Sequence, residues 1–89
     1  MTPRVVKTPQ TEADLIDQFT FIGTDRPAAA FRFIEAANQA FQSLARMPGI
    51  GGRWQGGRRE TRGLRVWPIP RFRQYLIFYR ELETGIEVV

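Results

Sequence analysis

The stretch LRVWPIPRFRQYLIFYR, residues 64–80, reads as two β-strands joined by a short basic turn. The first strand, residues 64–69, alternates in character, whereas the second, residues 74–80, is apolar on both faces at its centre. A strand that is apolar on both faces is expected inside a sheet, with a covering layer on each side. Because proline lacks an N–H donor, Pro68 and Pro70 should end the first strand or place a bulge in it. The rest of the chain is expected to fold around this hairpin.

Two helices are predicted upstream of the hairpin and should cover one of its faces. A short strand at residues 4–7 comes first, and Thr11 then has the side chain expected to cap a helix that stops at Gly23. A second helix is predicted from the cap Asp25 to about Arg46, because its apolar residues recur at helical spacing. The link between the helices is so short that they must pack as an antiparallel hairpin. The residues expected to face the sheet are Leu15, Phe19, Ile34, Phe41 and Leu44.

The segment between the second helix and the β-hairpin, residues 47–63, is predicted to be loop, since it holds six glycines and no periodic pattern. After the hairpin, Gly85 is expected to turn the chain into a last strand at residues 86–89. The element order is then β-αα-βββ. This order predicts an α+β fold of two layers, in which a helical hairpin packs on a small antiparallel sheet.

The composition restricts both the size of the fold and its chemistry. The chain has 89 residues, which suits a single domain over residues 1–89. It contains neither cysteine nor histidine, which removes disulfides, thiolate metal sites and the usual general base near neutral pH. No apolar run is long enough to span a bilayer, and the first residues lack the apolar core of a signal peptide. We therefore expect a cytoplasmic protein without a metal or other cofactor.

Positive charge is concentrated in the second half of the chain. The formal net charge is +4, yet residues 1–47 carry five basic and five acidic side chains and are balanced. Residues 53–80 carry eight arginines and one acidic residue, Glu60. Guanidinium groups suit bidentate contacts with carboxylates or phosphates, so the partner of this half should be acidic. The alternative is a solvated basic loop that only keeps a small domain soluble.

Six residues form the candidate partner-binding set. Arginines on the two strands of the hairpin are favoured over those of the loop, because strands hold them in fixed positions. Trp67 either packs on a face of the sheet or stacks on a base. Phe31 lies roughly 110° from the centre of the apolar stripe of its helix, so it is either an edge-of-core side chain or an exposed contact. The set is Phe31, Arg65, Trp67, Arg71, Arg73 and Arg80.

Catalysis has weaker support in the sequence. Arg53, Arg65 and Arg80 could stabilise charge on a phosphate, but there is no evident acid–base pair. Tyr75 and Tyr79 fall inside the predicted central strand, where core packing or one hydroxyl hydrogen bond accounts for them. The glycine-rich stretch GIGGRWQGG follows a helix and has no GK[ST] ending, so it is not a phosphate-binding loop. No catalytic residue is assigned.

Seven motifs follow one another within residues 4–89: EADLIDQFTFIG, DRPAAA, RFIEA, FQSLARMPGIG, LRVWPI, RQYLIFYR and GIEVV. In this order they resemble the ParE toxins of the RelE/ParE superfamily, the toxic halves of bacterial type II toxin–antitoxin pairs. The resemblance implies a small cytoplasmic protein with the β-αα-βββ fold. It also implies a domain that is short at its C-terminal end, because family members usually continue past GIEVV with a basic tail.

The same resemblance implies the partners. Antitoxins of this family pair a DNA-binding N-terminal part with a tail that wraps the toxin, so the toxin meets nucleic acid only indirectly. ParE-type toxins act on DNA gyrase, whereas RelE-type relatives cut mRNA in the ribosome. We expect a gyrase inhibitor that is not an enzyme, neutralised by a ParD-like antitoxin whose tail is acidic and amphipathic. The alternatives are a ribosome-dependent mRNA endonuclease and a degenerate toxin that only binds its antitoxin.

Overall fold

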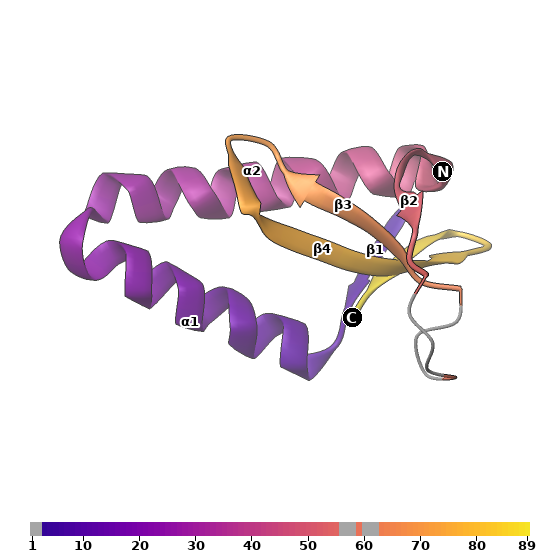
Figure 1. Cartoon of the computed structure of the whole chain (residues 1–89), viewed down its shortest axis with the longest axis horizontal. Helices are drawn as coiled ribbons and strands as arrows, with labels where there is room; N and C mark the ends of the chain where they lie inside the picture. The colour runs from indigo at the N-terminus through magenta and orange to yellow at the C-terminus, as the bar shows by residue number, and fades with distance from the viewer. Residues whose placement is uncertain (1–2, 56–58, 60–62) are drawn as a thin grey trace.

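A helical hairpin lies on one face of a five-stranded sheet in the computed structural model, which describes residues 3–55, 59 and 63–89 (Figure 1). The predicted α+β fold is confirmed, with one strand more than expected. In chain order the elements are β1 (Arg4–Lys7), α1 (Pro9–Asp25), α2 (Pro27–Arg46), the 3₁₀-helix η1 (Pro48–Ile50), β2 (Gly52–Arg53), β3 (Arg65–Ile69), β4 (Phe72–Leu82) and β5 (Gly85–Val88).

The strands follow the order β1-β5-β4-β3-β2, which places β4 at the centre of the sheet, as its sequence predicted. β1 pairs with β5 in parallel, whereas the other neighbouring strands are antiparallel. The sheet is therefore mixed, and not wholly antiparallel as expected. Gly85 begins β5 opposite Arg4, and a side chain at Gly85 would collide with the Arg4 backbone. Its φ of 154° is likewise open mainly to glycine.

The core forms between α2 and the central strands. Phe33, Phe41 and Leu44 of α2 are almost completely buried, and they belong to one cluster with Ile77 and Tyr79 of β4. Phe41 and Leu44 are among the residues expected to face the sheet, so their prediction is confirmed. Burial of such apolar side chains is the main term that stabilises a fold of this size.

The first helix contributes to the core only in part. Leu15 of α1 and Ile34 of α2 are half-buried and pack against the cluster, in agreement with their predicted direction. Phe19 is half-buried and instead packs its ring edge-to-face on Phe31 of α2, with centroids 5.2 Å apart. Phe19 therefore joins the two helices to each other and does not reach the core cluster.

The helices cover only one face of β4, which corrects the expectation of a cover on both sides. Ile77 and Tyr79 are buried in the core, so the alternating residues Leu76 and Phe78 lie on the opposite face. Leu76 is 49% exposed, and Phe78 packs its ring against that of Trp54, with centroids 5.2 Å apart. Apolar residues on both faces of a strand do not themselves supply a second layer. Among the described elements, the helices are the layer that covers the sheet.

The first helix begins earlier than predicted. Thr8, and not Thr11, caps α1, because its Oγ1 accepts a hydrogen bond from the Thr11 N–H at 3.1 Å. Pro9 suits the first helical position, since it has no N–H to satisfy and its φ is already helical. Thr11 is buried in the first turn, where its hydroxyl donates to the Val88 carbonyl of β5 at 3.1 Å. Two threonines could serve as caps, and the proline between them decides which one does.

The first helix also continues past Gly23, where it was expected to stop, and ends at Asp25. A Cβ built on Gly23 would lie 3.4 Å from the Cβ of Ala30, so this glycine lets the two helices approach closely. Arg26 is the single residue between the helices, and Pro27 opens α2. Asp25 is therefore not the cap of α2, as had been predicted, although the end of α2 agrees with its prediction.

The glycine-rich segment contains more structure than predicted. η1 follows α2 almost directly, and β2 pairs with β3 through Gly52 with Val66 and Arg53 with Arg65. A strand of two residues has no repeat from which it could be recognised in a sequence. Residues 56–58 and 60–62 of this segment lie outside the described residues.

The β-hairpin has a shorter connection than predicted. β4 begins at Phe72, so Pro70 and Arg71 make the turn, and not residues 71–73. The register between β3 and β4 shifts just after Pro68, which confirms the bulge expected at the prolines. The turn and the bulge together set the direction of the hairpin tip beside α2.

Replacing Phe41 by alanine is expected to lower the free energy of unfolding by about 3–5 kcal/mol, because the change leaves a cavity in a close-packed core. The whole stability of a small domain is of similar size, about 5–15 kcal/mol. Denaturant unfolding followed by circular dichroism measures the loss. Phe31→Ala, at a side chain that is 68% exposed, is the control and should cost much less. A loss below about 1 kcal/mol for Phe41→Ala would show that this ring is not core.

Candidate functional site

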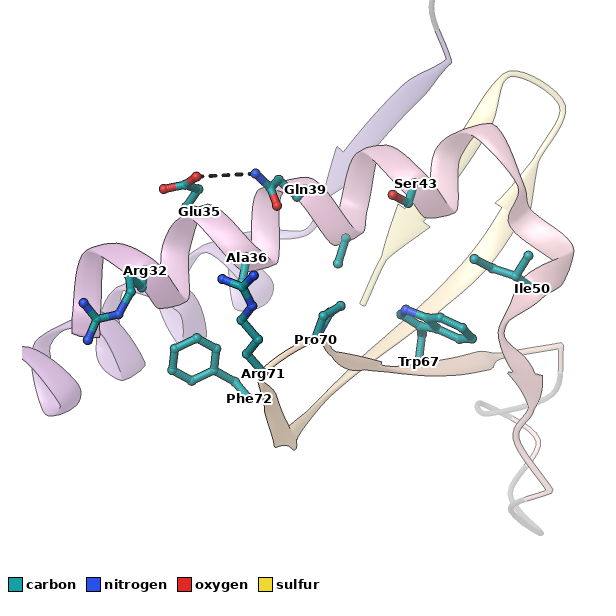
Figure 2. Close-up of a pocket in the computed structure, with 11 residues that line it drawn as sticks. Arg32, Glu35, Ala36, Gln39, Ser43, Ile50, Trp67, Pro70, Arg71 and Phe72 are labelled. Carbon is teal, nitrogen blue, oxygen red and sulfur yellow. Dashed lines mark hydrogen bonds between the residues drawn. The ribbon is translucent and has the colours of Figure 1, made fainter. Parts of the chain in front are cut away.

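The tip of the β-hairpin and α2 border an open groove of about 920 Å³ (Figure 2). The apolar part of its lining comes from both elements, with Trp67 and Phe72 from the hairpin and Ala36 and Ala40 from α2. An apolar surface with a few polar groups around it is typical of a binding site. The polar part of the lining consists of Arg32, Glu35, Gln39, Ser43 and Arg71.

The turn of the hairpin directs Arg71 toward this groove. Arg71 has a φ of 72°, in the left-handed region that residues other than glycine seldom adopt. Pro70 holds a negative φ at the first central residue of this turn, and a type II turn then needs a positive φ at the second, which is Arg71. Figure 2 shows the side chain rising from the turn toward α2. The backbone conformation of the turn thus presents a guanidinium group at the groove.

The aromatic side of the groove is anchored in the core. Phe72 packs edge-to-face on Phe33 of α2 with ring centroids 5.4 Å apart, and Tyr75 meets the same ring at 5.0 Å. Phe72 and Trp67 are both half-buried and pack against the core cluster. The apolar lining is therefore in place before any partner binds.

Arg32 lines the same groove from α2, although it is not among the six predicted partner-binding residues. It lies outside the arginine-rich residues 53–80, on the polar face of a helix, where a solvated side chain is ordinary. Within the described part of the chain, no ion pair joins Arg32 or Arg71 to an acidic residue. Glu35 is the one carboxylate in the lining, and it accepts a hydrogen bond from Gln39 at 3.4 Å. The groove therefore carries a net positive charge.

Arg65, a predicted partner-binding residue, is engaged within the protein. Its Nε donates to Oε1 of Glu81 at 2.8 Å. Its Nη1 donates to the Gly51 carbonyl at 2.8 Å and to the Gly49 carbonyl at 3.4 Å. Arg65 thus fastens the segment after α2 to β3 and β4.

Tyr79 completes the attachment of that segment. Its ring is fully buried, and its hydroxyl donates to the Pro48 carbonyl at 2.6 Å and accepts from the Gly51 N–H at 3.0 Å. Its prediction as a core residue is confirmed, with two hydrogen bonds in place of one. A Cβ on Gly51 would collide with the phenol, so glycine is required there. Burial raises the pKa of the Tyr79 hydroxyl, which keeps its proton for the bond to Pro48.

The other predicted residues lie on other surfaces. Arg80 is half-buried on the face of β4 that the helices leave uncovered. Arg73 is exposed near the start of β4 and does not line the groove. Phe31 is exposed on α2, where it contacts α1. Of the six predicted residues, the groove brings together Trp67 and Arg71.

A second hollow, of about 700 Å³, brings together three arginines that could stabilise charge on a phosphate. They are Arg53, Arg65 and Arg80, and Trp54 lies beside them. Glu81 is the carboxylate in this lining, and it is paired with Arg65. The arrangement suits binding of an anion more clearly than transfer of a proton.

The model of one protein family, described as the ParE toxin of the type II toxin-antitoxin system, parDE, matches residues 5–89. The chain belongs to this family. Membership means that the toxin has an antitoxin as its partner. None of the curated proteins compared with the chain is similar enough to count as a relative. No helix in the described ranges is long and apolar enough to cross a membrane, and the same residues hold no cluster of His, Cys, Asp or Glu that could bind a metal ion.

Replacing Tyr79 by phenylalanine should lower the toxin's free energy of unfolding by about 1–3 kcal/mol, because a buried carbonyl and a buried N–H lose their partner. Tyr75→Phe is the matched control, since no hydrogen bond of the Tyr75 hydroxyl is found in the described structure. Denaturant titrations of both variants and the wild type measure the difference. Equal losses in the two variants would show that the Tyr79 hydroxyl contributes nothing.

The raised pKa of Tyr79 also predicts how stability depends on pH. In the unfolded chain the phenol loses its proton near pH 10, whereas in the folded toxin it does so at a higher pH. Its contribution is therefore present in full below about pH 10 and is lost as the pH rises toward the folded pKa. Melting temperatures measured from about pH 8 to 11 should fall more steeply for the wild type than for Tyr79→Phe. Parallel curves for the two proteins would contradict this prediction.

Proposed function

We propose that this toxin acts in the cytoplasm by binding and inhibiting DNA gyrase, and that a ParD-like antitoxin neutralises it. The observation that carries the proposal is the match of the ParE toxin model to residues 5–89. The ordered motifs that resemble ParE toxins support the same reading. Since ParE-type toxins act on gyrase and RelE-type relatives on mRNA, membership in the ParE family favours gyrase as the target.

The positions of the tyrosines and of Glu81 support binding in preference to catalysis. A general base must be able to reach and accept a proton near neutral pH. The chain has no histidine, and the Tyr79 hydroxyl is occupied by two hydrogen bonds within the protein. The Tyr75 ring packs on Phe33, and Glu81 is paired with Arg65. We therefore propose a toxin that is not an enzyme.

One observation favours a second candidate function, ribosome-dependent cleavage of mRNA. Three arginines, Arg53, Arg65 and Arg80, line the second hollow, and although Arg65 is paired with Glu81, the positive charge there could stabilise the charge that develops on a phosphate during cleavage. A third candidate is a degenerate toxin that only binds its antitoxin. The three candidates differ in what the purified toxin does to gyrase and to the ribosome.

Supercoiling by purified gyrase and cleavage of ribosome-bound mRNA should be measured side by side with the same preparation of toxin. We expect supercoiling to be inhibited while the mRNA stays intact, because the toxin binds its target without cutting nucleic acid. Addition of the antitoxin is the control and should restore supercoiling. Cut mRNA with normal supercoiling would contradict gyrase inhibition and support the mRNA endonuclease. Normal supercoiling and intact mRNA would leave only the degenerate toxin.

The charge of residues 53–80 supports an acidic, amphipathic antitoxin tail, since charged groups attract an opposite partner during its approach. Arg71→Glu combined with Arg73→Glu should slow association with the antitoxin and weaken its dependence on salt. Both side chains are exposed, so folding should be unaffected. The control is Arg71→Lys combined with Arg73→Lys, which keeps the charge. Association rates for the wild type that do not change between low and high salt would contradict the electrostatic attraction.

A further inference from the structure

We propose that the groove between α2 and the hairpin tip binds an acidic amphipathic segment of the antitoxin, and that Arg32 and Arg71 are its two anchors. The inference rests on the proposed function in that it takes the antitoxin as the partner. It goes further by naming the groove that the antitoxin occupies, the acidic character of the bound segment and the two arginines that hold it.

The groove presents the two chemistries that an amphipathic segment needs. Trp67 and Phe72 form a half-buried apolar surface that the core holds in position. Arg32 borders this surface from α2, and Arg71 borders it from the turn. A segment could therefore lay apolar side chains on the two aromatic rings while its carboxylates meet a guanidinium group on either element.

Charge decides which partner fits best. The lining has two arginines and one carboxylate, Glu35, and neither arginine has an acidic partner in the described residues. A second copy of the chain would bring a net charge of +4 against them. A nucleic acid stacks its bases on exposed ring faces, whereas Trp67 and Phe72 are half-buried. An acidic peptide matches the guanidinium groups and needs only apolar contact with the rings.

Arg71 and Arg73 provide the sharpest test, because they are two residues apart, both exposed, and only Arg71 lines the groove. The probe is the full-length cognate antitoxin, and association and dissociation are measured separately. Each change to glutamate reverses one charge, so both should slow association to a similar degree. Arg71→Glu and Arg32→Glu should in addition raise the dissociation rate by about tenfold or more, whereas Arg73→Glu should leave it unchanged.

A second pair of variants tests the groove without changing charge. Gln39 and Asn38 are neighbouring exposed residues of α2, and Gln39 lines the groove whereas Asn38 does not. Gln39→Trp should obstruct the groove and raise the dissociation rate, while Asn38→Trp should behave as the wild type. Removing the like charge by Glu35→Gln should slow dissociation. Melting temperatures of all variants should stay close to the wild type, since these side chains are exposed.

The outcomes separate this inference from the proposed function. A wild-type toxin that binds no antitoxin would overturn the proposed function and the groove assignment together. Tight binding that Arg32→Glu, Arg71→Glu and Gln39→Trp leave unchanged would overturn the groove assignment only. A toxin that dimerises through the groove, with Gln39→Trp making it monomeric, would also overturn it. Binding of a short RNA to the groove, lost in Arg71→Glu and kept in Arg73→Glu, would replace the acidic peptide with a nucleic acid.

Discussion

The phenol of Tyr79 is the contact on which the shape of this domain depends. Its ring lies in the core between α2 and the sheet, and its hydroxyl binds the Pro48 carbonyl and the Gly51 N–H. These two hydrogen bonds hold the segment that follows α2 against β4. Arg65 adds hydrogen bonds to the same segment from β3. With one end of α2 tied to the sheet in this way, the helix runs beside the hairpin, and the groove is the space between them (Figure 2).

Repeating patterns in the sequence predicted most of the fold. The spacing of apolar residues found both helices, and the YLIFY run placed β4 at the centre of the sheet. The start of α1 was harder to predict, because Thr8 and Thr11 are chemically equivalent as helix caps. Pro9, which suits the first helical position, makes Thr8 the cap. β2 is too short to carry a pattern. The parallel pairing of β1 with β5 joins residues far apart in the chain, so no local signal announces it.

The candidate site was predicted less well than the fold, for a physical reason. Arginines that follow one another in the sequence have the same charge but lie on different surfaces of the fold. Arg65 is bound within the protein, Arg80 lies on the uncovered face of the sheet, and Arg71 reaches the groove. Arg32 lines the groove from α2, and its neighbours in the sequence do not distinguish it from a solvated helix residue. The role of a cation depends on which elements the fold brings together, and spacing along the chain does not encode that.

The position of β5 between β1 and β4 has a consequence for the newly made chain. The strand that is synthesised first has no neighbour in the sheet until residues 85–88 have been added (Figure 1). Closing so long a loop costs entropy before any contact repays it, and folds with such distant pairings form slowly. A nascent chain can therefore form its helical hairpin early, but it can close its sheet only after β5 has emerged from the ribosome. The order of the strands therefore delays closure of the sheet until residues 85–88 have been made, and an antitoxin already present would meet a closed sheet only from that moment.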